Sequence, residues 1–347
     1  MSVPVAPSGY NTFIPDHESS GRMVVDFSRD PKKFALPRYC QYVPVKKNTG
    51  FYLEMTVEEA GRIVDTDMAN FYWPDGAEAP KSRDALEEFN FLPYRTKRYA
   101  PDFVLGDLTA EQATWDVMAQ HLRIKSQQMM TGRTVKAVTA LTTTGNYASS
   151  HHSDVASISG NTGNWAASTT ARQDIKRSLN YAAQLIELDT LSSVDEGSLM
   201  LVIGPSLAAK MSESQEIVDH IKGSPEAYAQ VKGELPGRNS NYGLPDKIYG
   251  YDVIIEKTAR VSTRKGATTT KSFVMPNATA VMCSRVGGLV GVADAPSFST
   301  LTCFLKEEMT VEKKHDVDNR RMLGRVVDDF EVVLTAPVSG FVFTNAQ

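Results

Sequence analysis

Apolar side chains recur at helical spacing after residue 109. Thr109 and Gln112 have the spacing of a capping box, in which two side chains satisfy free backbone N–H groups at a helix start. The apolar positions that follow at helical spacing are Trp115, Met118, Leu122 and Met129. We therefore predict one long helix over 109–131, ended by Gly132, and we expect its apolar side to face the body of the chain.

A second helical pattern follows a segment of low complexity. Ser, Thr, Gly and Asn make up 18 of the 29 residues of 142–170, which predicts a loop or a cluster of turns. Thr170 and Gln173 then form another capping box. The apolar stripe that follows is Ile175, Leu179, Ala182 and Ile186. This stripe predicts a helix that runs to about Leu188.

Two extended limbs with many aromatic residues precede these helices. Residues 38–56 alternate between polar and apolar, although Pro44 restricts this strand to a sheet edge or a bulge. Residues 89–105 read as the returning limb, and about fifty turn-rich residues lie between the two. The aromatic residues of the limbs are Tyr42, Phe51, Tyr52, Phe89, Phe91, Tyr94 and Tyr99. No helix of the limbs' own covers these rings, so we expect some of them to dock on another molecule.

Basic residues are interleaved with these aromatic rings. They are Lys46, Lys47, Arg95, Lys97 and Arg98. We expect protein–protein contact through this surface in preference to nucleic-acid binding or an inert surface. The acidic partners that we expect are Glu307, Glu308 and Glu312, which lie in a charged excursion of the tail over 307–321.

The remaining strands fall in the second half of the chain. Short apolar or alternating segments predict them at 198–203, 249–258, 281–284, 301–306, 323–334 and 338–344. A turn at Gly204 and Pro205 leads from the first of these strands into short helices. This succession predicts a compact α/β region over about 190–290. The N-terminal 34 residues are different, because Pro4, Pro7 and Pro15 break any helix there and apolar residues are sparse, so we expect an arm.

Composition excludes several classes of protein. The chain has 347 residues, enough for two or three domains, and its formal charge is 37 − 41 = −4, unlike that of a strongly basic nucleic-acid binder. No run of about 20 apolar residues could span a bilayer, and the first seven residues do not resemble a signal peptide, so we expect a cytosol-like compartment. Cys40, Cys283 and Cys303 are odd in number and widely spaced, so we expect reduced, buried thiols.

A search for catalytic and metal-binding motifs finds little. Phosphate-binding, dinucleotide, esterase and zinc-protease motifs are absent. His151, His152 and Asp154 have the residue types of a metal site, but adjacent histidines point apart, so we expect exposed loop histidines. Asp328 and Asp329 read as a solvated strand face. We therefore predict no catalytic, cofactor-binding or metal-binding residues and a protein that is not an enzyme.

Several segments together resemble one family. They are 42–47, 51–53, 109–131, 199–205, the segment 244–253 with its Gly250-Tyr251-Asp252-Val253, and 338–345. In this order they resemble the major capsid protein of tailed bacteriophages, whose α+β shell fold is named after the Hong Kong phage. The resemblance implies an N-terminal arm (1–37), an extended β-hairpin E-loop (38–105) and a spine helix with the first part of a peripheral domain (106–189). It further implies an axial, or apical, domain (190–297) and the closing strands of the peripheral domain (298–347).

The resemblance also implies a function and partners. The chain would self-assemble, through pentamers and hexamers, into the icosahedral shell around a double-stranded DNA genome. It would be found in the virion after assembly in the host cytoplasm, and it would contact packaged DNA only weakly and no membrane. No long charged helical segment precedes residue 34, so a separate scaffolding protein is implied, beside a portal and possible decoration proteins.

The resemblance assigns the intersubunit contacts to the two limbs. The contact residues expected there are Tyr42, Lys46, Lys47, Phe51, Tyr94, Arg95, Lys97 and Arg98. Two alternatives remain open at this point. One is the shell of a bacterial nanocompartment with the same fold, and the other is a metal-dependent hydrolase that uses His151, His152 and Asp154.

Overall fold

The computed structural model describes most of the chain. The described residues are 34–55, 72–76, 78, 89–113, 116–194, 196–222, 242–285 and 299–347. Most of the predicted arm (residues 1–33) and Trp115 lie outside them. Phe34 and Leu36, at the end of the range predicted for the arm, are buried in the chain's own core. Within the described residues, no helix is both long enough and apolar enough to cross a membrane.

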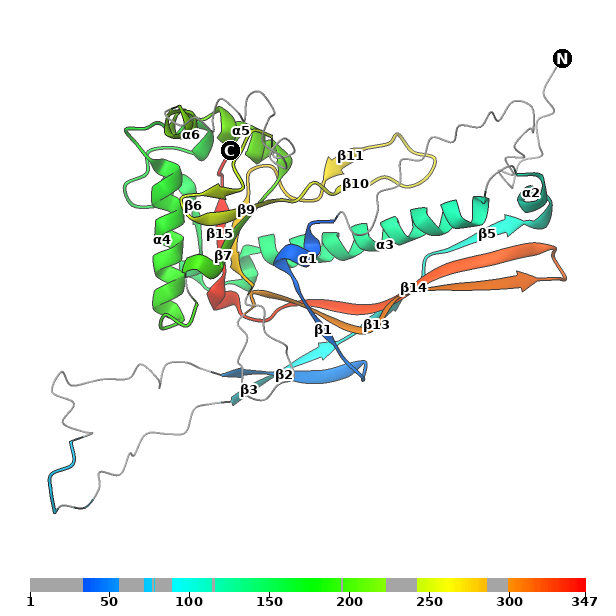
Figure 1. Cartoon of the computed structure of the whole chain (residues 1–347), viewed down its shortest axis with the longest axis horizontal. Helices are drawn as coiled ribbons and strands as arrows, with labels where there is room; N and C mark the ends of the chain where they lie inside the picture. The colour runs from blue at the N-terminus through cyan, green and yellow to red at the C-terminus, as the bar shows by residue number, and fades with distance from the viewer. Residues whose placement is uncertain are drawn as a thin grey trace.

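An elongated unit is built from a long hairpin and a long helix. Its sheet has the order β1 (Gln41–Pro44), β13 (Leu301–Asp316), β14 (Arg321–Leu334) and β4 (Lys97–Tyr99), with β5 (Asp102–Gly106) also paired to β14. The helix α3 (Val117–Thr142) runs along this sheet (Figure 1). The strand β1 lies at the sheet edge, which confirms the prediction from Pro44. A short helix, α1 (Leu36–Tyr39), precedes it.

The predicted bounds of the long helix are wrong at both ends. Residues near Thr109 form a separate helix, α2 (Asp107–Gln112), and the carboxylate of Asp116 accepts the backbone N–H of Ala119 at 2.9 Å to cap α3. Gly132 lies inside α3 and is exposed. The helix continues past it because the next two turns bury their apolar side, including Ala137, Val138 and Leu141. Tertiary packing thus overrides a local stop signal.

The apolar side of α3 faces the body, as predicted. Met118 is buried with Phe103 and Leu105 of β5, and Leu122 packs against this cluster while staying half-buried. The charged tail excursion differs from its prediction, because β13 and β14 pair almost continuously out to Asp316 and Arg321. The excursion is therefore the outer half of one hairpin, and the strand predicted at 301–306 extends to Asp316.

A second, more compact unit contains a six-stranded sheet. Its order is β6 (His152–Asp154), β15 (Phe341–Thr344), β12 (Ala280–Ser284), β7 (Leu199–Ile203), β9 (Tyr251–Ile255) and β8 (Lys247–Ile248). The helices beside this sheet are α4 (Asp174–Asp189), α5 (Pro205–Glu213) and α6 (Gln215–Ile221) (Figure 1). Short 3-10 turns surround β6, at Thr144–Asn146, Ser149–His151, Val155–Ser157 and Trp165–Ala167. The turn cluster predicted from low complexity is thereby confirmed.

The predicted stripe of α4 is confirmed, but its predicted cap is wrong. Ile175, Leu179, Ala182 and Ile186 are all fully buried. Thr170 does not cap the helix, and its hydroxyl instead donates to Asp219 at 2.5 Å. The buried carboxylate of Glu216, from α6, accepts the backbone N–H groups of Ile175 and Lys176 at 3.1 Å each. A distant side chain therefore takes the role predicted for a local one.

The compact unit draws on distant parts of the chain. One core contains side chains of α4, β7, β12 and β15, including Ile175, Leu201, Met282 and Phe343. The domain boundaries predicted after residues 189 and 297 therefore separate segments that share this one core. The reason is that the C-terminal β15 pairs with β12, a contact that spacing along the sequence does not reveal.

Two small hairpins leave these units. One pairs β2 (Thr49–Met55) with β3 (Phe89–Arg95), and the other pairs β10 (Ala259–Val261) with β11 (Lys271–Phe273). In Figure 1 they leave the body on opposite sides, with the second on the side of α3.

Candidate intersubunit surface

The β2–β3 ribbon is the pair of limbs that the sequence predicts to dock elsewhere. Its register places Phe51 opposite Pro93 and Gly50 opposite Tyr94. Because side chains alternate between the two faces of a strand, Phe51, Phe91 and Pro93 share one face of the ribbon. Tyr52, Leu92 and Tyr94 share the other face.

The inner face of the ribbon packs on its own subunit. The ring of Tyr94 stacks on Phe304 of β13, with 4.3 Å between ring centroids and 10° between planes. Tyr52 stacks on the same ring at 5.9 Å. A Cβ atom at position 50 would collide with the Tyr94 ring, so glycine at this position lets that ring lie across the strand. Tyr94, predicted as an intersubunit contact, is thus engaged within its own chain.

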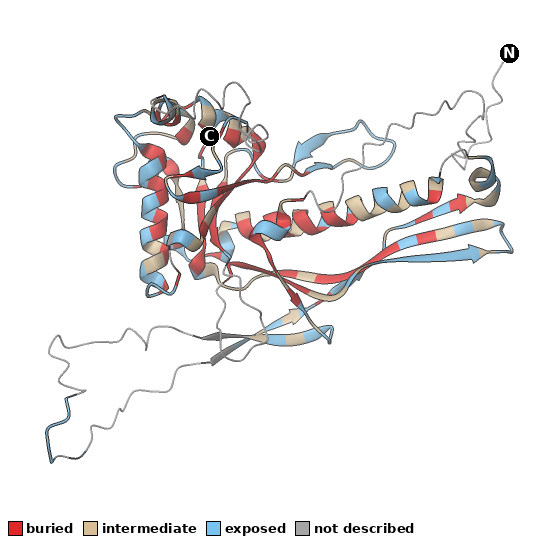
Figure 2. Ribbon diagram, viewed as in Figure 1, coloured by how far each residue is buried: buried red, intermediate tan, exposed pale blue. Residues whose placement is uncertain are grey.

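The outer face of the ribbon is bare. Phe51 is 69% exposed and Phe91 is 63% exposed, and Pro93 between them is exposed as well. Figure 2 shows this part of the ribbon in the colours of exposed and intermediate residues. Phe51 lies opposite Pro93 and diagonal to Phe91 on this face. The three side chains therefore form one continuous apolar patch.

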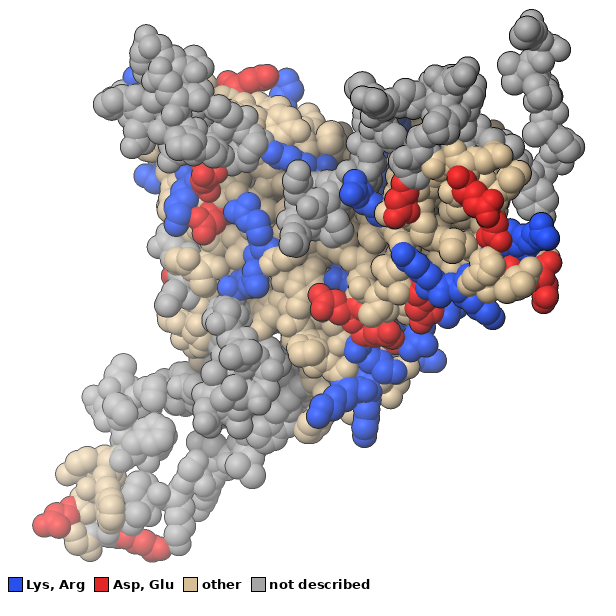
Figure 3. Space-filling model, turned by 45° about the vertical axis from the view of Figure 1, so that its right-hand side comes forward, with Lys and Arg blue, Asp and Glu red and all other residues tan. Residues whose placement is uncertain are grey.

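The basic residues beside this patch divide into two groups. Lys46, Lys47, Arg95 and Lys97 are exposed, and no acidic side chain among the described residues lies within ion-pair distance of them. Arg98 is different, because it lies 3.6 Å from Glu307 and 3.8 Å from Asp329 of its own chain. Figure 3 shows basic and acidic side chains interspersed over the face of the molecule that it presents.

Comparison with known proteins addresses the fold. No family model matches the chain, and no curated protein matches it. A phage-related protein from Bordetella bronchiseptica RB50 matches with a TM-score of 0.60 at 12% identity, over 91% of this chain and 93% of its own. The capsid protein of cyanophage P-SCSP1u matches with a TM-score of 0.55 at 10% identity, over 96% of this chain and 93% of its own. The mature capsid protein of bacteriophage PhiM1 matches with a TM-score of 0.53 at 12% identity, over 99% and 92%.

The chain has the major capsid protein fold of tailed phages. The similarity extends over nearly the whole chain, so both units and the ribbon belong to the capsid fold. The fold predicted from the resemblance of segments between residues 42 and 345 is therefore confirmed.

Within this capsid fold, Tyr42, one of the predicted contact residues, packs against the core of its own chain. It lies in β1, its hydroxyl is buried, and the Arg133 guanidinium carbon lies 5.6 Å from its ring centroid. Burial raises the pKa of the Tyr42 hydroxyl well above its usual value. Among the predicted contact residues, Lys46, Lys47, Phe51, Arg95 and Lys97 are exposed in the free chain.

The acidic partners predicted on the tail are also partly engaged within the chain. Glu307 pairs with Arg98, and Glu312 forms an ion pair with Arg325 across the β13–β14 hairpin. Glu308 is exposed and has no ion-pair partner among the described residues.

Two predictions about titratable residues of the capsid fold are wrong. Asp328 and Asp329 are buried, not solvated, and Arg133 of α3 pairs with Asp328 at 2.5 Å. His151 is also buried, and its Nδ1 and Nε2 atoms lie 2.8 Å from the Gly340 carbonyl and 2.7 Å from the Asp189 carboxylate. Both arrangements join elements far apart in sequence, and a motif search cannot detect them.

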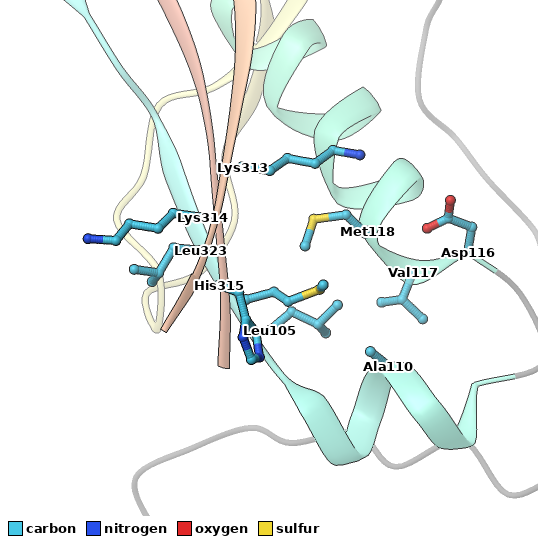
Figure 4. Close-up of a pocket in the computed structure, with 10 residues that line it drawn as sticks. Leu105, Ala110, Asp116, Val117, Met118, Lys313, Lys314, His315 and Leu323 are labelled. Atoms are coloured by element: carbon cyan, nitrogen blue, oxygen red, sulfur yellow. The ribbon is translucent and has the colours of Figure 1, made fainter. Parts of the chain in front are cut away.

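A hollow lies near the tip of the β13–β14 hairpin of the capsid fold. It encloses about 340 Å³ between this hairpin and the start of α3. Figure 4 shows Leu105 and Met118 pointing into it, while Lys314 points away. His315, at one side, is bonded to Asp107 at 2.9 Å. The lining is largely apolar, and no group of three or more metal-ligating side chains occurs among the described residues.

Proposed function

We propose that the chain is the major head protein that self-assembles into the icosahedral shell enclosing the double-stranded DNA genome of a tailed phage. In this proposal, the β2–β3 ribbon is the E-loop and α3 is the spine helix. The β13–β14 unit is the peripheral domain, and the six-stranded unit is the axial domain. The capsid fold over almost the entire chain supports this assignment.

The observation that carries the proposal is the two-faced ribbon. Its inner face stacks on Phe304, whereas Phe51 and Phe91 project outward without cover. A large aromatic side chain buries about 150–250 Å², worth about 25 cal/mol for each Å². An isolated two-stranded ribbon is only marginally stable in water, so a second surface that covers these rings would stabilise it.

The neighbouring subunit is the surface that we propose. The exposed cations Lys46, Lys47, Arg95 and Lys97 frame the apolar face, and they would meet acidic side chains such as Glu308 of that neighbour. An apolar centre with a charged rim is the usual composition of a specific protein interface. The contact would repeat around pentamers and hexamers.

The proposal includes the protein's surroundings. The chain would be assembled in the host cytoplasm with a separate scaffolding protein, a portal and possible decoration proteins, and it would reside in the virion. It would act as a structural protein and not as an enzyme. It would contact no membrane and would hold the packaged DNA weakly.

Removal of the exposed rings tests the proposal. The double variant Phe51→Ser, Phe91→Ser should remain folded, because both side chains are exposed in the free subunit, but it should fail to form shells. The matched control is Phe273→Ser, which removes an exposed phenylalanine from β11. Electron microscopy of purified particles provides the readout. Normal shells from the double variant, beside normal shells from the control, would overturn the proposed role of the ribbon.

A further inference from the structure

The β10–β11 hairpin is the most strongly basic segment that the structure describes. Between residues 257 and 273 the chain has five Lys or Arg residues and no Asp or Glu, although its net charge is −4. Every residue from Ala259 to Phe273 is exposed except the half-buried Thr263. The hairpin therefore presents concentrated positive charge to its surroundings.

The backbone fixes this charge at the hairpin tip. Ala267 donates its N–H to the Arg264 carbonyl at 3.2 Å, and Gly266 has φ of +95°. These two features define a tight turn in which glycine supplies the left-handed conformation. Lys265 consequently occupies the corner of the turn beside Gly266, and Arg264 begins the turn. Ser262 and Thr270 close the hairpin below the turn, with a further bond from the Thr270 N–H to the Thr263 hydroxyl.

Four cations of the hairpin lack an acidic partner among the described residues. Arg260, Arg264, Lys265 and Lys271 have no acidic side chain within ion-pair distance among the described residues. Hydroxyl groups surround them, from Ser262, Thr263, Thr268, Thr269, Thr270 and Ser272. Arg260 and Ser272 share one face and Val261 and Lys271 the other, so both faces of the hairpin carry positive charge.

We propose that the β10–β11 hairpin is a sequence-independent binding site for the phosphate backbone of DNA. Lys, Arg, Ser and Thr side chains are the groups that contact phosphates in protein–DNA complexes. A second copy of the chain is the less favoured partner, because interface centres are depleted of lysine and enriched in aromatic and other apolar residues. Only Val261 and Phe273 are large apolar side chains here. The inference extends the proposed function, since DNA is the polyanion that a phage shell encloses.

The arrangement of the chain leaves this site accessible. The hairpin leaves the body on the side of α3, whereas the β2–β3 ribbon leaves it on the opposite side (Figure 1). A subunit docked through its ribbon would therefore keep the hairpin free. Because the site has only a few cations, it would bind DNA weakly. Its affinity for DNA would fall as the salt concentration rises.

Salt-dependent binding of a labelled DNA duplex of about 20 base pairs tests the proposal. The full chain is titrated, with fluorescence anisotropy as the readout, between about 50 and about 200 mM salt. Each neutralised phosphate contributes about 0.9 to the slope of log affinity against log salt, so Arg264→Gln with Lys265→Gln should reduce that slope by about 1.8. The affinity ratio of wild type to variant should accordingly shrink about tenfold over this range.

The control carries the same change of charge elsewhere. Lys313→Gln with Lys314→Gln neutralises two exposed cations of β13 and should leave the slope unchanged. Equal slopes for wild type and the hairpin variant would overturn the proposal, as would the absence of binding at the lowest salt. A hairpin variant that loses shell formation but binds DNA normally would also overturn it, by assigning the hairpin to subunit contact. Shell formation is scored separately, so failure of the shell proposal is distinguishable from failure of the DNA site.

Discussion

Arg133 of α3 and Asp328 of β14 form a buried ion pair, with 2.5 Å between Nη2 and Oδ2. Both side chains are almost inaccessible, at 6% and 0% exposure. The Arg133 guanidinium also lies 5.0 Å from the ring centroid of Phe330. Burial raises the pKa of Asp328, and the Arg133 charge opposes this shift. The pair fixes the long helix against the hairpin on which the elongated unit is built.

Loss of one partner of this pair should strongly destabilise the subunit. Arg133→Met leaves the Asp328 carboxylate buried without a counter-charge, which costs about 3–5 kcal/mol in comparable pairs. Denaturant unfolding of the free subunit measures the change. The control is Lys136→Met, because Lys136 and Glu331 are 3.6 Å apart but partly exposed, and the expected cost there is below about 1 kcal/mol. Similar losses in both variants would contradict the role given to the buried pair.

The three cysteines should be unreactive in the folded chain. Burial raises the pKa of the Cys283 and Cys303 thiols to about 12, and it raises that of Cys40 as well. Alkylation requires the thiolate, so iodoacetamide at about pH 8 should modify none of them before denaturation and all three afterwards. Mass spectrometry of the intact protein gives the count. Rapid labelling of Cys303 in the native chain would mean that the edge between β1 and β13 opens.

The turn of the β13–β14 hairpin should lose stability in acid. Asn319 and Arg321 donate to the Asp316 carboxylate at 2.9 and 2.8 Å, and these bonds hold the pKa of Asp316 below its ordinary value. Because the folded pKa is lowered, the stabilisation is fully present above the unfolded value near 4 and is lost as pH falls through the folded value. Hydrogen-exchange protection at residues 317–320 should therefore decrease in acid.

Two neighbouring variants isolate the effect of Asp316. Asp316→Asn should remove the acid-sensitive part of the protection, whereas Asp318→Asn, an exposed change in the same turn, should retain it. Identical acid profiles in wild type and Asp316→Asn would refute the assignment.

Reversal of two exposed charges should block assembly without unfolding the subunit. Arg95→Glu with Lys97→Glu places acids where the proposed interface needs cations, and neither residue has an acidic partner to lose among the described residues. Surface changes of this kind alter stability by about 0.5 kcal/mol or less, so the melting temperature should hardly move. Lys313→Glu with Lys314→Glu is the matched control. Normal assembly of the first variant, or its unfolding, would show that the ribbon is not the clasp between subunits.

Local patterns predicted much of the architecture. The buried stripe of α4, the edge position of β1 and the pairing of two aromatic limbs all follow from spacing or from proline chemistry. These features depend on neighbours in the sequence. The exposed face of the ribbon that carries Phe51 also follows from the local sequence, because side chains alternate between the two faces of a strand.

The wrong predictions share a physical cause. The cap predicted at Thr170 is replaced by Glu216, and the stop predicted at Gly132 is overridden by packing against distant strands. Asp328 and His151 are buried because partners from other elements reach them. Contacts between residues far apart in the chain decide each case, and no spacing rule contains them.

The native mass of the purified chain tests the central claim most directly. Sedimentation velocity separates a free subunit of 38.1 kDa from pentamers, hexamers and shells of megadalton size. We expect the full chain alone to form capsomers, and closed shells once its scaffolding protein is supplied, and the Phe51→Ser, Phe91→Ser variant to remain at the mass of the free subunit. A wild-type chain that sediments only as a 38.1 kDa monomer, at every concentration and salt, would contradict the account.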